Sequence, residues 1–383
     1  MKIAIAQIEI IPGRPDLNFI KIKEYVDKAK DKNVDMVVFP ELSVPGYLIG
    51  DMWEERAFLN DVALYNQEVI KLAKDIHIVF GTISINFENN YTDGRPIINN
   101  ILYYVDAKMG AFRITKTLLP NYREFEEPRH FQSAIDEHKL NIPGRKLSYF
   151  MPIDVNSIKV GFCLCEDGWD QDYPIKPIKM LVDNGAELII NISCSPYTCG
   201  KNRSRNRVFG EGHAKQNKVP LIYVNAVGIQ NNGKTIYTFD GSSIAYNKEG
   251  MAVASAPMFE ETLMFVDYNN TIDDLCITES FQTKEKEPND IAEIAEALKY
   301  GIKKYLTQVG TDKVVIGISG GIDSAVAASL YAQVIGAKNL LLVNMPTKYN
   351  SKTTKNIAQN IAKRIGCYYT EIPIEKSIAL TTR

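Results

Sequence analysis

Three residues in the first half of the chain carry groups that could together perform nucleophilic catalysis. Glu41 follows the apolar run VVFP, Lys116 lies in ITKTLLP, and Cys165 ends the apolar run VGFCLC. A thiol is a useful nucleophile only when a base or a positive charge acts on it. Nothing in the sequence signals a Cys-His pair, so a carboxylate base and an oxyanion-stabilising lysine would have to supply those functions.

Each of these residues also has an ordinary explanation when it is taken alone. A cysteine at a strand end is more often a small core residue than a nucleophile. Glu41 could be a loop carboxylate and Lys116 a surface cation. Cys163 competes with Cys165 for the nucleophile role, since two residues along a strand place it on the same face. Cys165 is favoured because two acids and Gly168 follow it.

A second group of residues suits the binding of an anion. The apolar run KVVIGI leads into Ser319-Gly320-Gly321-Ile322-Asp323-Ser324, which opens a helical pattern. Two glycines allow positive φ and a close approach of an anion to the backbone. Exposed N–H groups at a helix start favour phosphate. The alternative is a tight turn capped by Asp323 or Ser324. The loop is neither a Walker A motif, whose lysine is missing, nor a G-x-G-x-x-G fingerprint.

The first two-thirds of the chain alternate short apolar runs with helical patterns. The runs are rich in Ile, Val, Phe and Tyr, are bounded by turn residues, and predict strands. They cover 2–10, 34–40, 77–85, 97–105, 158–165, 186–193, 220–228, 242–246 and 262–267. Helices are predicted over 17–31, with Asp16 as N-cap, and over 61–75 and 176–184. This mixture predicts a layered α/β sandwich rather than a purely doubly wound sheet.

The composition changes near residue 268. Residues 268–289 are polar and without sustained periodicity, so they predict a linker between domains of 1–267 and 290–383. Helical periodicity returns over 290–307, and a β-α-β-α alternation typical of a parallel sheet follows.

The overall composition excludes several classes of function. A net charge of −2 offers no general basic field for nucleic acid. The start MKIAIAQIEI does not resemble a signal peptide, and no apolar run reaches 18 residues, so neither export nor a membrane span is predicted. Six cysteines without C-x-x-C pairs favour free thiols in the cytoplasm over zinc or disulfides.

In combination, P-E-L, K-T-x-L-P and C-E-D-x-W resemble the nitrilase superfamily over about residues 1–267. The resemblance implies an α-β-β-α sandwich in which Glu41 is the general base, Lys116 the oxyanion stabiliser and Cys165 the nucleophile. LPNYREFEEPRHF and SPYTCGK are similar to segments of its glutamine-hydrolysing members. That similarity implies further glutamine-site residues, namely Tyr122, Glu127, Glu166, Ser195 and Lys201.

S-G-G-x-D-S resembles the pyrophosphate loop of adenylating ATP pyrophosphatases, which have Rossmann-like parallel α/β domains. The resemblance implies ATP on residues 319–324, with Mg²⁺ near Asp323. The segment VNMPTKYNS matches the family's next strand and loop more loosely, which places Met345 beside the adenine and Ser351 on the loop.

A nitrilase-type glutaminase followed by such a loop is the arrangement of glutamine-dependent NAD⁺ synthetases. That resemblance implies hydrolysis of glutamine and ATP-dependent amidation of deamido-NAD⁺ through an adenylate, in a homo-oligomer. Because the chain stops at Arg383, only the start of the second domain is expected. Four alternatives stay open: a glutaminase or amidase serving another adenylating unit, a free-standing amidase, a chain with glutaminase activity only, and a non-enzymatic binding or assembly module.

Overall fold

The structure is a computed structural model that describes residues 1–91, 93–137, 149–231, 233–277, 290–349 and 351–381. It divides into two compact units, Met1–Glu287 and Pro288–Arg383. In the described part of the chain, every helix is too short or too polar to cross a membrane.

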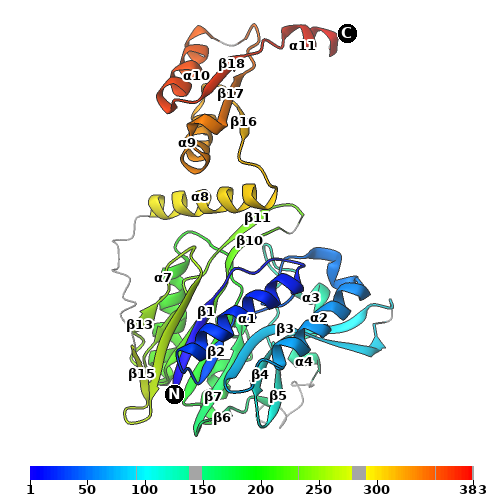
Figure 1. Ribbon diagram of the computed structural model, residues 1–383, viewed down its shortest axis with the longest axis vertical. Helices are drawn as coiled ribbons and strands as arrows, with labels where there is room; N and C mark the ends of the chain where they lie inside the picture. The colour runs from blue at the N-terminus through cyan, green and yellow to red at the C-terminus, as the bar shows by residue number, and fades with distance from the viewer. Residues whose placement is uncertain (92, 138–148, 232, 278–289, 350, 382–383) are drawn as a thin grey trace. The chain divides into compact units, whose positions relative to one another are not determined.

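Two β-sheets form the centre of the first unit (Figure 1). The seven-stranded sheet has the order β15 (Asp274–Ile277), β14 (Thr262–Asn269), β1 (Lys2–Gln7), β2 (Met36–Val38), β3 (His77–Asn90), β4 (Pro96–Asp106) and β5 (Gly110–Thr115). The six-stranded sheet has the order β13 (Ala252–Ser255), β12 (Ile244–Tyr246), β9 (Leu221–Asn225), β8 (Leu188–Ser193), β7 (Ile158–Leu164) and β6 (Ile153–Val155). In both sheets the central strands are parallel, and antiparallel strands flank them.

Side chains that alternate along each strand build three apolar layers. Ile3 and Ile5 of β1 pack between the two sheets, against residues such as Ile190 of β8. Ala4 and Ala6 point the other way, into a cluster with α1 (Pro15–Asp31) and α2 (Arg56–Ile70). The outer face of the second sheet is covered by α6 (Pro177–Asp183) and the π-helical segment Asn206–Lys215. The predicted α-β-β-α sandwich is confirmed.

Two predicted helices begin at different residues in the structure. Helix α1 starts at Pro15, so Arg14 takes the N-cap position and Asp16 lies inside the first turn. Proline is favoured at the first helical position because its missing N–H would have no helical partner there. Helix α2 starts at Arg56, five residues before the prediction, because Phe58 and Leu59 belong to its buried face.

The segment predicted as a linker contributes strands at its beginning. Tyr268 and Asn269 end β14, and β15 (Asp274–Ile277) pairs with it in antiparallel orientation. Leu275 is buried between the sheets. The polar stretch 270–273 is thus the turn of an edge hairpin, whose composition resembles that of a linker. Residues 278–289 of the predicted linker lie outside the described residues.

The second unit contains a parallel sheet of three strands, β16 (Val314–Gly317), β17 (Leu340–Asn344) and β18 (Tyr368–Glu371). The helices α8 (Asp290–Gln308), α9 (Ile322–Ile335), α10 (Lys352–Ile365) and α11 (Glu375–Thr381) precede, connect or follow the strands. A separate apolar cluster that includes Ile318, Ala328, Leu342 and Ala358 holds α9 and α10 against the sheet. The predicted β-α-β-α alternation is confirmed.

Candidate active site

The ends of strands in both sheets bring the three candidate residues of the first unit together. Glu41 follows β2 and Lys116 follows β5, both of the seven-stranded sheet. Cys165 follows β7 of the six-stranded sheet and opens a 3₁₀ turn, Cys165–Gly168. The group therefore lies where the edges of two packed sheets meet.

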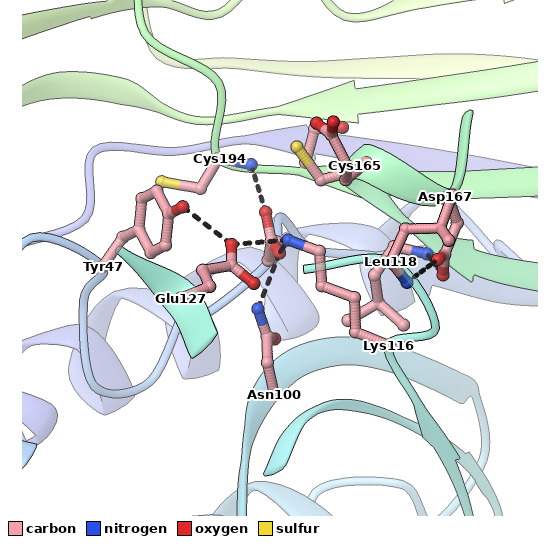
Figure 2. Close-up of polar contacts among 12 residues, drawn as sticks. Tyr47, Asn100, Lys116, Leu118, Glu127, Cys165, Asp167 and Cys194 are labelled. Carbon is pink, nitrogen blue, oxygen red and sulfur yellow. Dashed lines mark hydrogen bonds and ion pairs between the residues drawn. The ribbon is translucent and has the colours of Figure 1, made fainter. Parts of the chain in front are cut away.

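The Glu41 carboxylate is fully buried and accepts three hydrogen bonds, whose donors Asn100, Lys116 and Cys194 are labelled in Figure 2. Its Oε1 accepts hydrogen bonds from Asn100 Nδ2 at 2.8 Å and from Lys116 Nζ at 2.7 Å. Its Oε2 accepts a hydrogen bond from the backbone N–H of Cys194 at 2.9 Å. Donors on both of its oxygens fix the orientation of the carboxylate.

Lys116 lies between two carboxylates. Besides Glu41, its ammonium contacts Glu127 Oε1 at 2.6 Å. Burial acts to lower the pKa of Lys116, but Glu127 and Glu41 outweigh it and raise that pKa well above its ordinary value. The side chain is therefore a fixed positive charge in a site shielded from water.

Glu127 opens the short helix α3 (Glu127–His130), and Tyr47 OH also donates to its Oε1 at 2.7 Å. Burial raises the pKa of Glu127 to about 7, against the opposing effect of Lys116. Its Oε2 is buried without a hydrogen-bond partner among the described residues. That oxygen is available to a group that enters the site.

Cys165 has a backbone conformation that is unusual for a residue with a side chain. Its φ of +37° lies near the left-handed region, where non-glycine residues are strained. Burial raises the pKa of its thiol, Glu41 raises it further, and Lys116 lowers it. The thiol is neutral at rest, so a base has to take its proton during an attack.

The rival thiol lies in a different layer. Cys163 packs in the apolar cluster beneath α6, with Leu181 and Phe209, and its Sγ accepts from Asn191 Nδ2 at 3.3 Å. The two cysteines were expected on one face of a strand. The positive φ at Cys165 ends the strand alternation there, and Cys165 is the thiol that lies beside Lys116 in Figure 2.

Asp167 connects two of the segments that carry the candidate residues. Its Oδ1 accepts from the backbone N–H groups of Thr117 at 3.1 Å and Leu118 at 2.8 Å. Its Oδ2 accepts from the backbone N–H of Leu164 at 3.2 Å. Burial raises the pKa of Asp167 to about 7, although all three N–H groups act to lower it.

Two of the predicted glutamine-site residues, Tyr122 and Glu166, are hydrogen-bonded to each other. Tyr122 OH donates to Glu166 Oε2 at 3.1 Å, and Tyr173 OH donates to Glu166 Oε1 at 2.9 Å. Tyr122 is half exposed while Glu166 is buried. Burial raises the pKa of Glu166, and nearby Lys116 opposes the shift.

Lys201 and Ser195 lie on the segment that follows β8. Lys201 begins α7 (Lys201–Arg205), and its Nζ lies over the Trp169 ring, 4.6 Å from the centroid. Burial, and then Arg205, lower the pKa of Lys201. Ser195 is buried, and its backbone N–H donates to Asn225 Oδ1 at 2.8 Å.

In the second unit, the predicted anion loop joins β16 to α9. The Gly321 N–H donates to Ser319 Oγ at 3.2 Å, and Ser324 Oγ donates to the Gly321 carbonyl at 3.1 Å. Gly320 has φ +84°, and a Cβ there would lie 2.4 Å from the carbonyl oxygen of Thr354. Only glycine fits this close approach of the loop to α10. The exposed Asp323 lies in the first turn of α9.

The two remaining predicted residues flank this loop. Met345 is half exposed, and its Cε lies 3.4 Å from the position of a Cβ on Gly317, at the end of β16. Ser351 is the N-cap of α10 and accepts from the Thr354 N–H at 3.2 Å.

A preformed metal cage is missing from the described part of the chain, where no group of three or more His, Cys, Asp or Glu could hold an ion. Magnesium is nevertheless commonly bound through one or two carboxylates together with substrate phosphates. Asp323 beside the anion loop fits that mode of binding.

The sequence reasoning missed several partners of the site. Tyr47, Asn100 and Tyr173 come from segments without a recognised motif, and the Cys194 donor is a backbone N–H. One available signal was Asn99-Asn100 inside the apolar run IINNILYY, because asparagine is disfavoured in strands.

Comparisons with known proteins find two family matches. Residues 2–275 match the carbon-nitrogen hydrolase family, and residues 294–383 match the NAD synthase family. A glutamine-dependent NAD(+) synthetase from Synechocystis sp. is 31% identical over 97% of this chain and 64% of its own length. One from Aquifex aeolicus is 29% identical over 98% of this chain and 66% of its own length.

Comparison with solved structures also finds glutamine-dependent NAD+ synthetases and a member of the nitrilase superfamily. The glutamine-dependent NAD+ synthetase from Acinetobacter baumannii, solved in complex with ADP, has a TM-score of 0.81 and 28% identity. That match covers 100% of this chain and 66% of the other. An amidase of the nitrilase superfamily from Nesterenkonia AN1 covers 71% of this chain with a TM-score of 0.56 and 16% identity, which is a likeness of fold. The chain thus spans just under two thirds of the length of these synthetases.

Proposed function

Because this chain belongs to the carbon-nitrogen hydrolase family, we propose that its first unit hydrolyses the side-chain amide of glutamine to glutamate and ammonia. The observation that carries the proposal is the contact of the buried Glu41 carboxylate with the Lys116 ammonium, at 2.7 Å, beside Cys165. Nucleophile, base and positive charge are the three groups that acyl transfer needs.

The first half-reaction forms a thioester. The Cys165 thiol attacks the amide carbon while Glu41 takes its proton, as a neutral thiol requires. The carbonyl oxygen becomes an oxyanion, and the Lys116 ammonium stabilises its negative charge. The proton on Glu41 then passes to the nitrogen, the carbon–nitrogen bond breaks, and ammonia leaves.

The second half-reaction regenerates the enzyme. Glu41 takes a proton from water, whose oxygen attacks the thioester carbon, and Lys116 again stabilises the oxyanion. The carbon–sulfur bond breaks, the sulfur of Cys165 recovers its proton from Glu41, and glutamate is released. Glu127 keeps the Lys116 ammonium in place through both steps, supported by its 2.6 Å contact.

Charged side chains around the candidate triad suit the α-carboxylate and α-ammonium of glutamine. We assign Lys201 to the α-carboxylate, since its buried ammonium faces an aromatic ring and its pKa is lowered by burial. Glu166, with Tyr122 on its carboxylate, is assigned to the α-ammonium. Ser195, on the same segment as Lys201, completes the proposed pocket.

For the second unit we propose ATP binding in the amidation of deamido-NAD⁺. In this reaction the deamido-NAD⁺ carboxylate displaces pyrophosphate from ATP, and ammonia then displaces AMP from the adenylate to give NAD⁺. The loop Ser319–Ser324 would hold the pyrophosphate portion, with Met345 and Ser351 nearby. Asp323 would hold Mg²⁺, which neutralises phosphate charge when bound. The match of residues 294–383 to NAD synthase supports this proposal.

The remaining features of the proposal follow from the resemblance to the synthetases. We propose that the glutaminase domain ends with β15 and that the synthetase portion starts at α8. A homo-oligomer and a cytoplasmic location are also proposed. The six free cysteines and the use of ATP fit a reducing compartment. Analytical ultracentrifugation would test the oligomer.

The decisive experiment measures glutamate released from glutamine by the full chain. Cys165→Ala is expected to abolish release, and Cys276→Ser, at an edge strand, is the matched control that keeps it. An unchanged rate in Cys165→Ala would refute the assignment of the nucleophile. Supplying ATP and deamido-NAD⁺ as well, and measuring NAD⁺, separates the synthetase from an amidase that serves another adenylating unit.

A further inference from the structure

The strongest unexplained feature of the site is the carboxylate of Asp167. It is 1% exposed, and among the described residues three backbone N–H groups donate hydrogen bonds to it. The proposed mechanism gives it no task. A buried charge is costly, so a carboxylate retained in this position is a feature to explain.

The three donors come from two segments that are far apart in the sequence. Thr117 and Leu118 directly follow Lys116, while Leu164 directly precedes Cys165. Leu164 is extended, and Asp167 reaches back to its N–H from the third position of the turn, as the acidic residue of a capping box does. One side chain therefore contacts the backbone on both sides of the reacting groups.

These bonds also account for the conformation of the turn. The φ of +37° at Cys165 requires surroundings that hold it. The bond from Leu164 N–H to Asp167 closes the chain around Cys165, and the bonds from Thr117 and Leu118 fix this closed turn against the lysine segment (Figure 2 shows the contact with Leu118). Thr117 and Leu118 are each only 2% exposed, so without Asp167 their N–H groups would lose an acceptor inside the protein.

We propose that Asp167 is a positioning residue, whose carboxylate holds the Lys116 ammonium and the Cys165 sulfur in the arrangement needed for attack on an amide. It acts through the backbone of both segments and does not touch the substrate. The inference rests on the proposed amide hydrolysis, and it adds a requirement that the Glu41–Lys116–Cys165 group alone does not contain.

The test replaces Asp167 by its closest neutral analogue in the full chain. In Asp167→Asn the side-chain oxygen can still accept from Thr117 and Leu118, but an amide NH₂ would face the Leu164 N–H, donor against donor. Since small misplacements of reacting groups are costly, kcat for glutamine is expected to fall by about tenfold or more. The KM is expected to stay within about threefold, because Lys201 and Glu166 keep their contacts.

Asp274→Asn is the matched control. Asp274 is likewise a buried aspartate whose Oδ1 accepts two backbone N–H groups, from Lys248 and Leu275, but it lies in the edge strand β15. It undergoes the same chemical change and is expected to leave kcat unchanged. Circular dichroism at the assay temperature confirms that each variant is folded. If Asp167→Asn is not folded, Asp167→Glu, which lengthens the connection but keeps the charge, is measured under the same criteria.

A second readout is independent of glutamine. The rate at which iodoacetamide alkylates Cys165, followed by peptide mass analysis, is expected to fall with kcat, while alkylation of the exposed Cys199 stays unchanged. A folded Asp167 variant with kcat and Cys165 alkylation within about twofold of the parent would overturn the proposal, as would an equal loss of kcat in Asp274→Asn. If the parent chain does not hydrolyse glutamine, the proposed function fails, while the alkylation rates still decide the role of Asp167.

Discussion

At the scale of single residues, the site holds one ammonium between two carboxylates. Lys116 neutralises only one of the negative charges that Glu41 and Glu127 can carry. The imbalance raises the pKa of Lys116 and helps to raise that of Glu127. A neutral thiol beside this group is consistent with a base that receives the proton only when the sulfur attacks.

Replacing the proposed base without changing its shape tests this arrangement. Glu41→Gln can still accept from Lys116 at its amide oxygen but cannot take a proton from Cys165. We expect kcat for glutamate release to fall by about 10²- to 10⁴-fold, the range for loss of a general base. Steady-state kinetics with a matched melting curve measure it, and a kcat within about threefold of the parent would exclude Glu41 as the base.

The burial of Asp167 leads to a prediction about stability and pH. Its pKa is about 7 in the folded chain and near the ordinary 3.8 in the unfolded chain, so between these values the folded state binds more protons. The contribution of Asp167 to the stability of the parent therefore falls as pH rises from about 4 to about 7 and levels off above that. Asp167→Asn lacks this contribution.

Urea unfolding of both proteins at several pH values measures the effect. The free energy of unfolding of the parent minus that of Asp167→Asn is expected to decrease across this window. An increase with pH would mean that the three N–H groups outweigh burial and that the pKa of Asp167 is lowered.

At the scale of elements, strands that end in short turns carry the candidate catalytic groups. The residues after β2 and β7 could be predicted as site residues because each follows an apolar run that reads plainly as a strand. Their partners could not. Asn100 lies inside β4 and Tyr47 in a loop, and their closeness to Glu41 and Glu127 depends on how the strands pair.

Three further features could not be predicted from the sequence, each for a physical reason. The Cys194 N–H that contacts Glu41 has no sequence signal, because every residue except proline has such a group. The acid pair after Cys165 was noticeable in the sequence, but two of the three donors to Asp167 lie 49 and 50 residues away. The edge strand β15 was missed because its turn is as polar as a linker.

The anion loop supplies a prediction at the same scale. Gly320→Ala would combine a strained φ of +84° with a Cβ 2.4 Å from the Thr354 carbonyl oxygen. Gly366→Ala, with φ +79° and open space around it, is the matched control for strain alone. We expect Gly366→Ala to destabilise the second unit by about 1 kcal/mol and Gly320→Ala by several.

Scanning calorimetry of the full chain and ATP binding by isothermal titration compare the two variants. Weaker ATP binding is expected in Gly320→Ala only. Equal effects of the two substitutions would show that the approach of the loop to α10 is unimportant.

At the scale of the whole molecule, the chain combines two units that each have an apolar core of their own. The larger unit contains a complete sandwich with the candidate triad. The smaller unit matches NAD synthase over 294–383, within a chain that spans just under two thirds of the length of the similar synthetases. Fold class could be predicted for both, since strand and helix periods are local properties of the sequence.

The distribution of thiols is a property of the whole chain that can be measured directly. All six cysteines are free; Cys163, Cys165 and Cys194 are buried, and Cys199 is exposed. Titration with Ellman's reagent is expected to find six thiols in guanidinium chloride. In the native state we expect one fast thiol, Cys199, and slow reaction of the three buried ones. Fewer than six in denaturant under non-reducing conditions would indicate a disulfide.

The candidate triad takes its members from both sheets, and this has a mechanical consequence. Glu41 and Lys116 extend from one sheet, whereas Cys165 and the Cys194 N–H extend from the other. The apolar layer between the sheets therefore sets the distance from the proposed base to the Cys165 sulfur. A small slip of one sheet over the other would separate the two halves of the candidate triad while leaving every strand intact. The proposed activity would therefore report a change in the register between the sheets before the secondary structure did.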